Sequence, residues 1–190
     1  MAIAIDLRET DSNLFCASKW WGDPDMPSEM EYPTHEDYPL TFLCQINCEY
    51  LEKYDPQGLL PHTGMLYFFA AADSLLGYES PLSYGEGEWP RGAVRIKYSK
   101  DINFETFQSF EMVGEDGESV TDTAMEILFA PCDDGYPGLR LLGDAPEGYG
   151  DFVCLLQAAF GPEKGQKLCF LMKPSDISFG NWKKCTAVLV

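Results

Sequence analysis

The chain has 190 residues, of which 45% are hydrophobic and 14% aromatic, so it can bury a large core without disulfides or metal. Its 31 acidic and 13 basic residues give a net charge of −18 (31 − 13 = 18). Such a charge repels phosphate backbones and anionic lipids, which argues against binding to nucleic acid or membranes. It favours a basic protein partner or a cationic ligand, although solubility alone also explains it.

The N-terminal segment 1–11 lacks a basic stretch followed by a long apolar run, because Asp6 and Arg8 interrupt it early. We therefore expect neither a secretory signal nor a membrane-spanning segment. The seven cysteines, an odd number, fall mainly within apolar stretches. This is typical of reduced thiols that pack as small hydrophobic side chains. The sequence thus predicts a cytoplasmic protein and leaves its oligomeric state open.

The first expected element is a short strand over residues 2–5, followed by a helical or irregular piece. Four prolines between residues 24 and 39 predict that Gly22–Pro39 holds no regular element. Aromatic residues in and around this segment, Trp20 and Trp21 among them, indicate that the loop packs on the body of the protein.

The chain is organised around residues 39–76. In Phe42–Cys48 apolar and polar side chains alternate, which predicts a half-buried strand with Gln45 on its polar side. Met65–Ala70 is largely apolar and follows a glycine, which predicts a strand buried on both faces. Turn-forming residues between the two strands indicate an antiparallel pair.

Three later segments are also expected to have regular structure. Ala93–Tyr98 alternates between apolar and basic residues and predicts a half-buried strand. In Asn103–Val113 phenylalanines recur at every third position, which favours a short helix over a strand. Thr123–Pro131 alternates again and predicts another strand, followed by a loop over Asp133–Gly150.

A weaker version of the central pattern returns in residues 151–179. Gln157 lies 112 residues after Gln45 (157 − 45 = 112) within a similar apolar run. We therefore expect an internal duplication: a single domain over residues 1–190 with repeat units at 39–76 and 151–179. The predicted fold class is α+β, mainly antiparallel β, in which duplicated strand–loop–strand core units and few short helices pack as one compact body.

The sequence also resembles a known family. The matching residues are Ser18-Lys19, Gly22-x-Pro24, Tyr32-Pro33, Pro39-Leu40-x-Phe42-Leu43-x-Gln45-Ile46, Gly64-x-Leu66-Tyr67-Phe68-Phe69, Leu141-Leu142-Gly143 with Pro146, and Leu155-Leu156-Gln157. This pattern is similar to that of the YwqG-like family of uncharacterised bacterial proteins. The resemblance implies a compact α+β body of mainly antiparallel sheet, and it brings no reaction, cofactor or catalytic residue.

The standard catalytic motifs are missing from the sequence: there is no G-x-S-x-G, P-loop, H-E-x-x-H or G-x-G-x-x-G pattern. Cys44 and Cys48 do not have a usual zinc spacing. A metal site or a Cys–His dyad would have to use His35 or His62, the only histidines. We assign no catalytic residue, metal ligand or cofactor, and a non-enzymatic role is favoured.

Seven residues are candidate ligand-binding residues: Lys19, Trp20, Trp21, Gln45, Asp73, Gln157 and Asp176. The two glutamines either line a cleft shared by the repeat units or satisfy nearby backbone groups. The two aspartates either bind a ligand or cap the turns or helices that follow them. The lysine either binds a ligand or neutralises a neighbouring acid, and the tryptophans either stack on a ligand or fix the adjacent loop.

These patterns favour a non-enzymatic binding module, immunity-like or regulatory, whose acidic surface meets a basic protein partner. The alternative is a small-molecule or glycan binding protein, or an enzyme, that uses a cleft between the two repeat units. A metal-dependent enzyme is the third hypothesis.

Overall fold

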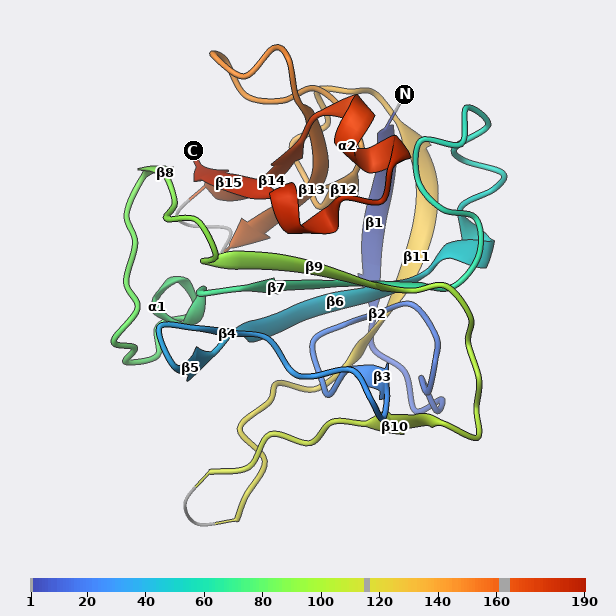
Figure 1. Ribbon diagram of the computed structural model, residues 1–190, viewed down its shortest axis with the longest axis vertical. Coiled ribbons are helices and arrows are strands. Elements are labelled where there is room, and N and C mark those ends of the chain that lie inside the picture. Colours follow the sequence, from blue (N-terminus) through green and yellow to red (C-terminus); the bar gives the residue numbers. More distant parts are fainter. Residues whose placement is uncertain (1, 115–116, 161–164) are drawn as a thin grey trace.

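The computed structural model describes residues 2–114, 117–160 and 165–190 (Figure 1). Its strands are β1 (Ala2–Arg8), β2 (Lys19–Trp20), β3 (Asp25–Pro27), β4 (Thr34–His35), β5 (Tyr38–Pro39), β6 (Thr41–Asn47), β7 (Met65–Ala70), β8 (Gly87–Glu88), β9 (Val94–Ser99), β10 (Phe107–Ser109), β11 (Met125–Cys132), β12 (Arg140–Leu141), β13 (Val153–Phe160), β14 (Gln166–Met172) and β15 (Thr186–Leu189). The helices are α1 (Asp73–Leu76), α2 (Pro174–Ser178) and the 3-10 turns η1 (Cys48–Tyr50) and η2 (Trp182–Lys184).

The described residues are therefore mostly antiparallel β, with two short α-helices, and the predicted α+β class is wrong. One reason lies in Asn103–Val113, where the spacing of the phenylalanines favoured a helix. The backbone N–H groups of Thr106 and Phe107 both bond to the Asn103 carbonyl, which forms a single turn. The chain then extends into β10, which pairs with β3. Helices in the described part of the chain do not exceed one or two turns, so none of them is long and apolar enough to cross a membrane.

The expectation that Gly22–Pro39 has no regular element is also wrong. This segment contains β3, which pairs with β10, and β4, which pairs with β5. Pro27 and Pro39 each belong to a strand of a small two-stranded sheet. Such edge positions tolerate proline because the missing N–H is not needed by a second neighbour.

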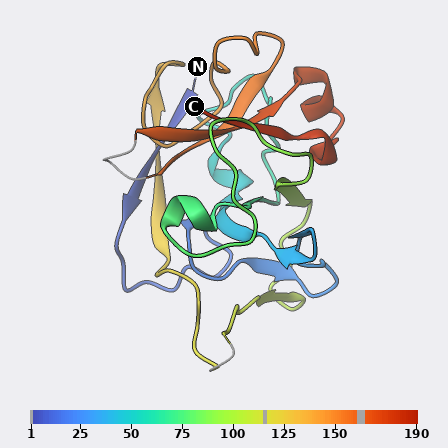
Figure 2. The same cartoon turned by 90° about the vertical axis from the view of Figure 1, so that its left-hand side faces the viewer.

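Eleven strands form one curled, half-barrel sheet in the order β8-β15-β14-β13-β12-β1-β11-β2-β6-β7-β9. In Figure 1, β6, β7 and β9 make one layer and β13, β14 and β15 make another, with β1 and β11 connecting them. Figure 2 shows β1 and β11 descending along one side of the molecule. The main hydrophobic core includes residues from both layers.

The central pair formed as predicted: β6 and β7 are antiparallel, with Gln45 opposite Tyr67. The pairing register shifts by one residue between Phe42 and Cys44, so Leu43 is a bulge. However, β6 is not half-buried, because Gln45 is 0% exposed. Its polar side is covered by the chain around Asp25, whose N–H bonds to the Gln45 side chain at 2.8 Å.

The order of the strands is the same on both sides of the β1–β11 pair. One side reads β11-β2-β6-β7-β9 and the other reads β1-β12-β13-β14-β15, and every neighbouring pair is antiparallel. The register shift in β6 at Phe42/Cys44 has a counterpart in β13 at Cys154/Leu156, 112 residues later (154 − 42 = 112). Each side therefore has a bulged hairpin at the same place in the sheet.

Candidate functional site

The main cavity has a volume of about 590 Å³ and lies where the chain enters β6 and leaves β7. Its floor contains the buried side chains of Leu40 and Phe42 and the partly buried Trp21. Its rim contains Tyr78 and Val120, which are more than half exposed. The volume falls within the range of roughly 300–1,000 Å³ that is typical of ligand sites.

One wall of the cavity comes from a tight turn after β2. Trp21 has a left-handed backbone conformation (φ 61°), which points its N–H at the Leu43 carbonyl at 2.9 Å. Gly22 follows, also at positive φ (74°), and its N–H bonds to the Asp122 carbonyl at 3.0 Å. A Cβ at Gly22 would stand 2.7 Å from the Ala124 Cβ. The turn therefore needs glycine both for its backbone conformation and for space.

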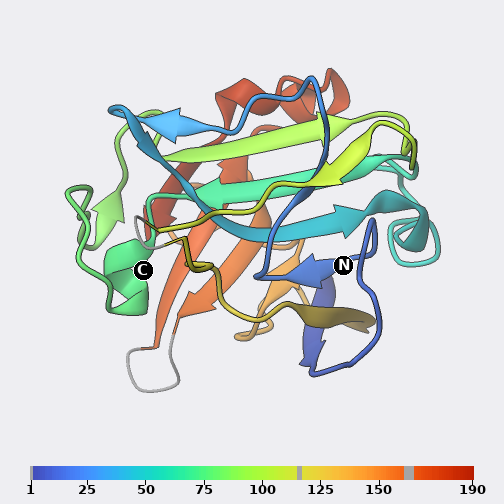
Figure 3. The ribbon, with the colours of Figure 1, turned by 90° about the horizontal axis from the view of Figure 1, so that it is seen from below.

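The apolar floor is fixed by aromatic contacts. The Tyr32 ring stacks on Phe110, with centroids 4.7 Å apart, and meets Phe69 edge-on at 5.3 Å. Its hydroxyl donates to the Leu40 carbonyl at 2.7 Å. In Figure 3, which shows the molecule from below, the described parts of the connection between β10 and β11 pass in front of β6 and β7. This connection brings residues 119–122 to the cavity.

Two carboxylates line the cavity from segments far apart in the sequence. Asp73, at the start of α1, accepts a hydrogen bond from the Thr41 hydroxyl. Asp122 accepts one from the Tyr78 hydroxyl at 3.3 Å. The pKa of Tyr78 is raised, chiefly by the charge of Asp122 and to a lesser extent by that of Asp73. Both carboxylates and the Tyr78 side chain line the same cavity.

A third carboxylate, Asp23, lies nearby and accepts a hydrogen bond from the Thr121 hydroxyl at 3.2 Å. The pKa of Tyr32 is raised, first by burial and then by the charges of Asp73 and Asp23. None of the described residues that line the cavity is lysine, arginine or histidine. The cavity thus combines negative charge with aromatic faces, a surface that attracts a cation with an apolar stem.

Lys19 and Gln45, two of the candidates from the sequence, belong instead to a buried network around Asp25. This carboxylate is 0% exposed, and one of its oxygens accepts from the Lys19 ammonium, the Gln45 amide and the Cys16 N–H, each at 2.8 Å. The other oxygen accepts from the Ser109 hydroxyl at 2.7 Å. The network joins β2, β3, β6 and β10, so it fixes the loop that carries Trp21.

Gln157 lies in a separate network in the other half of the sheet. Its amide donates to the Gly138 carbonyl at 2.7 Å and its oxygen accepts from the buried Arg140 at 3.2 Å. Four strands, β12, β1, β11 and β2, separate β13 from β6. Gln157 and Gln45 share no hydrogen-bond partner within the described ranges, and neither lines the main cavity.

Of the seven candidates, Trp21 and Asp73 line the main cavity, while Lys19 and Gln45 meet in the Asp25 network. Trp20 is buried in the core at 2% exposure. Asp176 lies in the first turn of α2 and accepts from Lys184 at 2.7 Å, which lowers the pKa of that carboxyl. Sequence reasoning missed Asp122 and Tyr78, because no local pattern shows that the segment before β11 folds back over β6.

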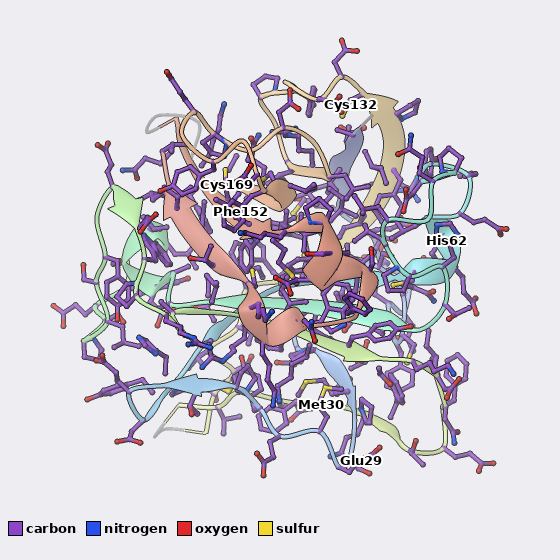
Figure 4. The ribbon with its side chains drawn as sticks, turned by 45° about the horizontal axis from the view of Figure 1, so that its top comes forward. Glu29, Met30, His62, Cys132, Phe152 and Cys169 are labelled. Atoms are coloured by element: carbon purple, nitrogen blue, oxygen red, sulfur yellow. The ribbon has the colours of Figure 1, made fainter. Side chains whose placement is uncertain are left out.

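The histidines are not joined to the cysteines. His35 bonds to the Tyr84 hydroxyl at 2.9 Å, and His62 lies 3.6 Å from the Asp55 carboxylate. In Figure 4, His62 projects from a loop well away from Cys169. In the part of the chain that the structure describes, no three or more His, Cys, Asp or Glu side chains are grouped to hold a metal ion.

Comparison with known proteins gives a family and no activity. A family model described as a domain of unknown function, DUF1963, matches residues 18–139, which is more than half of the chain. Every described residue that lines the main cavity falls within this matched segment. No curated protein matches the chain.

Proposed function

The chain belongs to the DUF1963 family, whose function is unknown, and we propose that it is a non-enzymatic binding module that recognises a basic polypeptide. The observation that carries the proposal is the main cavity, which is lined by carboxylates and aromatic rings and, among its described residues, by no basic side chain. Long-range attraction from a net charge of −18 would bring a basic partner to it.

The distribution of charges supports this role. Among the described residues, Asp25 and Asp55 are the buried acids, so the other described carboxylates reach solvent at least in part. Two of the bases, Lys19 and Arg140, are buried and cannot offset the surface charge by direct contact with a partner. Arg8 and Lys184 are paired with Glu126 and Asp176. The charge available to a partner is therefore strongly negative.

The test is direct binding of a lysine-rich synthetic peptide, followed by fluorescence anisotropy. We expect tight association at about 0.01 M ionic strength and strong weakening at about 1 M, because the screening length falls from roughly 30 Å to 3 Å. A glutamate-rich peptide of equal length is the control and is expected not to bind. Absence of binding to the basic peptide at low salt would refute the proposed function.

A small organic cation bound in the same cavity is the second candidate function, and the cavity volume of about 590 Å³ favours it. This site would differ from the cleft between repeat units expected from the sequence, because residues 151–179 contribute nothing to its described lining. A diamine that binds at high salt, when the peptide does not, would favour this candidate over the first.

Three further proposals concern the family, the location and the role of the protein. We propose that the chain is YwqG-like, supported by the match of residues 18–139, which includes the motif that carries the resemblance in the first half. We propose a cytoplasmic location, supported by seven cysteines that are all unpaired. An immunity-like or regulatory role would follow if the basic partner were a toxin or an enzyme, and capture of that partner would test it.

A further inference from the structure

Building on the proposed function, we propose that the main cavity receives a single lysine or arginine side chain of the basic polypeptide. The aliphatic stem of that side chain would lie on Trp21 and Phe42, and its cationic end would lie between Asp73 and Asp122. The basic polypeptide would thus be anchored at one position, rather than held only by diffuse charge.

The floor of the cavity fits an aliphatic stem. Phe42 and Leu40 are buried beneath it, and Trp21 is held by its edge-on contact with Trp20 at 5.4 Å. Lysine and arginine carry three or four methylene groups below the charge, which pack well on apolar surface. Aromatic faces also attract the cation itself. Anionic or short neutral side chains gain neither contribution.

The carboxylates have capacity left for a cation. Asp73 accepts from Thr41, and Asp122 accepts from Tyr78. A carboxylate offers about four acceptor positions, so a donor with several N–H groups can bond to both residues without displacing these partners. Asp73 and Asp122 both line the cavity, which none of the described lysine, arginine or histidine residues enters. A single ammonium or guanidinium group inserted there would meet negative charge from both residues.

The rim indicates that the cation belongs to a polypeptide. Tyr78 and Val120 are 54% and 59% exposed, and both line the cavity. Val113, in the same connection as Val120, is 58% exposed. Exposed apolar side chains that gather in one place, as Tyr78 and Val120 do at this cavity, commonly mark a contact surface. A free amine would leave them in water, whereas residues flanking an inserted lysine would cover them.

The experiment compares three peptides that differ at one central position: lysine, acetyl-lysine or norleucine, each with neutral flanking residues. Isothermal titration at moderate salt is expected to show binding of the lysine peptide, with at least tenfold weaker binding of the other two. The acetyl-lysine peptide keeps the stem and loses the charge, so equal binding of all three peptides would overturn the inference.

Substitutions of the two cavity aspartates test whether the lysine side chain binds in the main cavity. Asp73→Asn and Asp122→Asn keep an oxygen acceptor for Thr41 and Tyr78, so the fold is expected to persist. The double variant is expected to bind the lysine peptide at least about tenfold more weakly, since hydrogen bonds to charged groups are stronger than those between neutral groups. The matched control is Asp133→Asn with Asp151→Asn, which removes the same charge from exposed positions outside the cavity.

Different results would refute the proposed function and the insertion of a single side chain into the cavity. If the lysine-rich peptide binds the control and the Asp73/Asp122 double variant equally well, the inserted side chain is refuted and the proposed function stands. If the lysine-rich peptide binds neither the wild type nor the variants at low salt, the proposed function itself is refuted. If the double variant loses binding of the lysine peptide while the wild type and the control variant keep it, the result supports both the proposed function and the inserted side chain.

Discussion

Phe68 of β7 and Phe170 of β14 meet edge-to-face at the centre of the molecule, with ring centroids 5.5 Å apart and planes at 86°. Each residue holds the same position in its half of the sheet. Phe68 stands opposite Cys44, directly after the bulge in β6, and Phe170 stands opposite Leu156, directly after the bulge in β13. The two layers are therefore joined by a contact between equivalent residues.

This relationship extends to the order of the strands. β1 precedes β2 in the chain but pairs with β12, while β11 precedes β12 and pairs with β2. We infer that the chain contains an internal duplication, centred on residues 39–76 and 151–179, in which each copy gives its first strand to the other. Such an exchange would place β1 and β11 together in the middle of the sheet, where they are observed.

Truncation of the Phe68 side chain is expected to destabilise the protein strongly. Phe68→Ala is expected to lower the free energy of unfolding by about 3–5 kcal/mol, because the ring is fully buried and the layers cannot close the cavity left behind. Phe179→Ala is the control, since that ring is 80% exposed and is expected to change stability by less than about 0.5 kcal/mol. Denaturant titration measures both, and equal effects would contradict the account.

The buried Asp25 predicts a second large effect. Asp25→Ala leaves the ammonium of Lys19, a residue that is 6% exposed, without its carboxylate. Breaking a buried ion pair by removing one partner typically costs about 3–5 kcal/mol. The exposed Asp11→Ala is expected to be nearly neutral. A stable Asp25→Ala protein with an intact cavity would show that the network does not fix the Trp21 turn.

Two glycines, Gly22 and Gly58, allow the cost of backbone strain to be measured separately from the cost of steric crowding. Gly22 and Gly58 both have positive φ, at 74° and 63°, but a Cβ would lie 2.7 Å from Ala124 at the first and would meet nothing within 4 Å at the second. Gly58→Ala is expected to cost about 1 kcal/mol from backbone strain. Gly22→Ala is expected to cost clearly more and to weaken peptide binding. Equal unfolding midpoints for the two variants would rule out the crowding.

The buried thiols predict a loss of stability in alkali. Burial raises the pKa of Cys16 from 9.0 to about 11 and that of Cys48 from 9.0 to about 12. Above pH 9 the unfolded chain releases these protons while the native protein keeps them, so stability falls as pH rises. The stabilisation is complete below pH 9 and is lost as pH rises through about 11 and 12. Denaturation under reducing conditions at increasing pH measures the slope.

Two variants test the origin of this slope. Cys48→Ala removes a fully buried thiol and is expected to flatten the decline above pH 9. Cys132→Ser changes the one cysteine that is not buried, and is expected to leave the decline nearly unchanged. A decline that is identical in wild type and Cys48→Ala would assign the effect to other groups.

The sequence predicted the elements whose patterns are local. The bounds of Met65–Ala70 were predicted from its apolar run, and its antiparallel partner, expected over Phe42–Cys48, is present as Thr41–Asn47. The short strands β3 and β10 were missed because they pair only with each other, 80 residues apart in the chain, and have no periodicity of their own. A two- or three-residue strand is defined by its partner, and the partner is a tertiary property.

The main cavity includes two of the seven candidate residues. Trp21 stood out as an aromatic residue beside a proline-rich loop and Asp73 as an acid just after the second strand of the central pair, and both line the cavity. Gln45 stood out for its alternation with apolar residues, yet a buried polar residue in a strand is equally well explained by internal hydrogen bonds, which it makes. Asp122 completes the site through a long connection whose path no residue pattern indicates.

The most direct test of the binding account uses the four tryptophans as reporters. Trp21 lines the cavity, whereas Trp89 and Trp182 lie outside it. Nuclear magnetic resonance can follow the indole N–H signals as the lysine peptide is added. We predict that the Trp21 signal shifts in a saturable way and that those of Trp89 and Trp182 stay in place. Saturable binding that leaves the Trp21 signal unmoved would contradict the account.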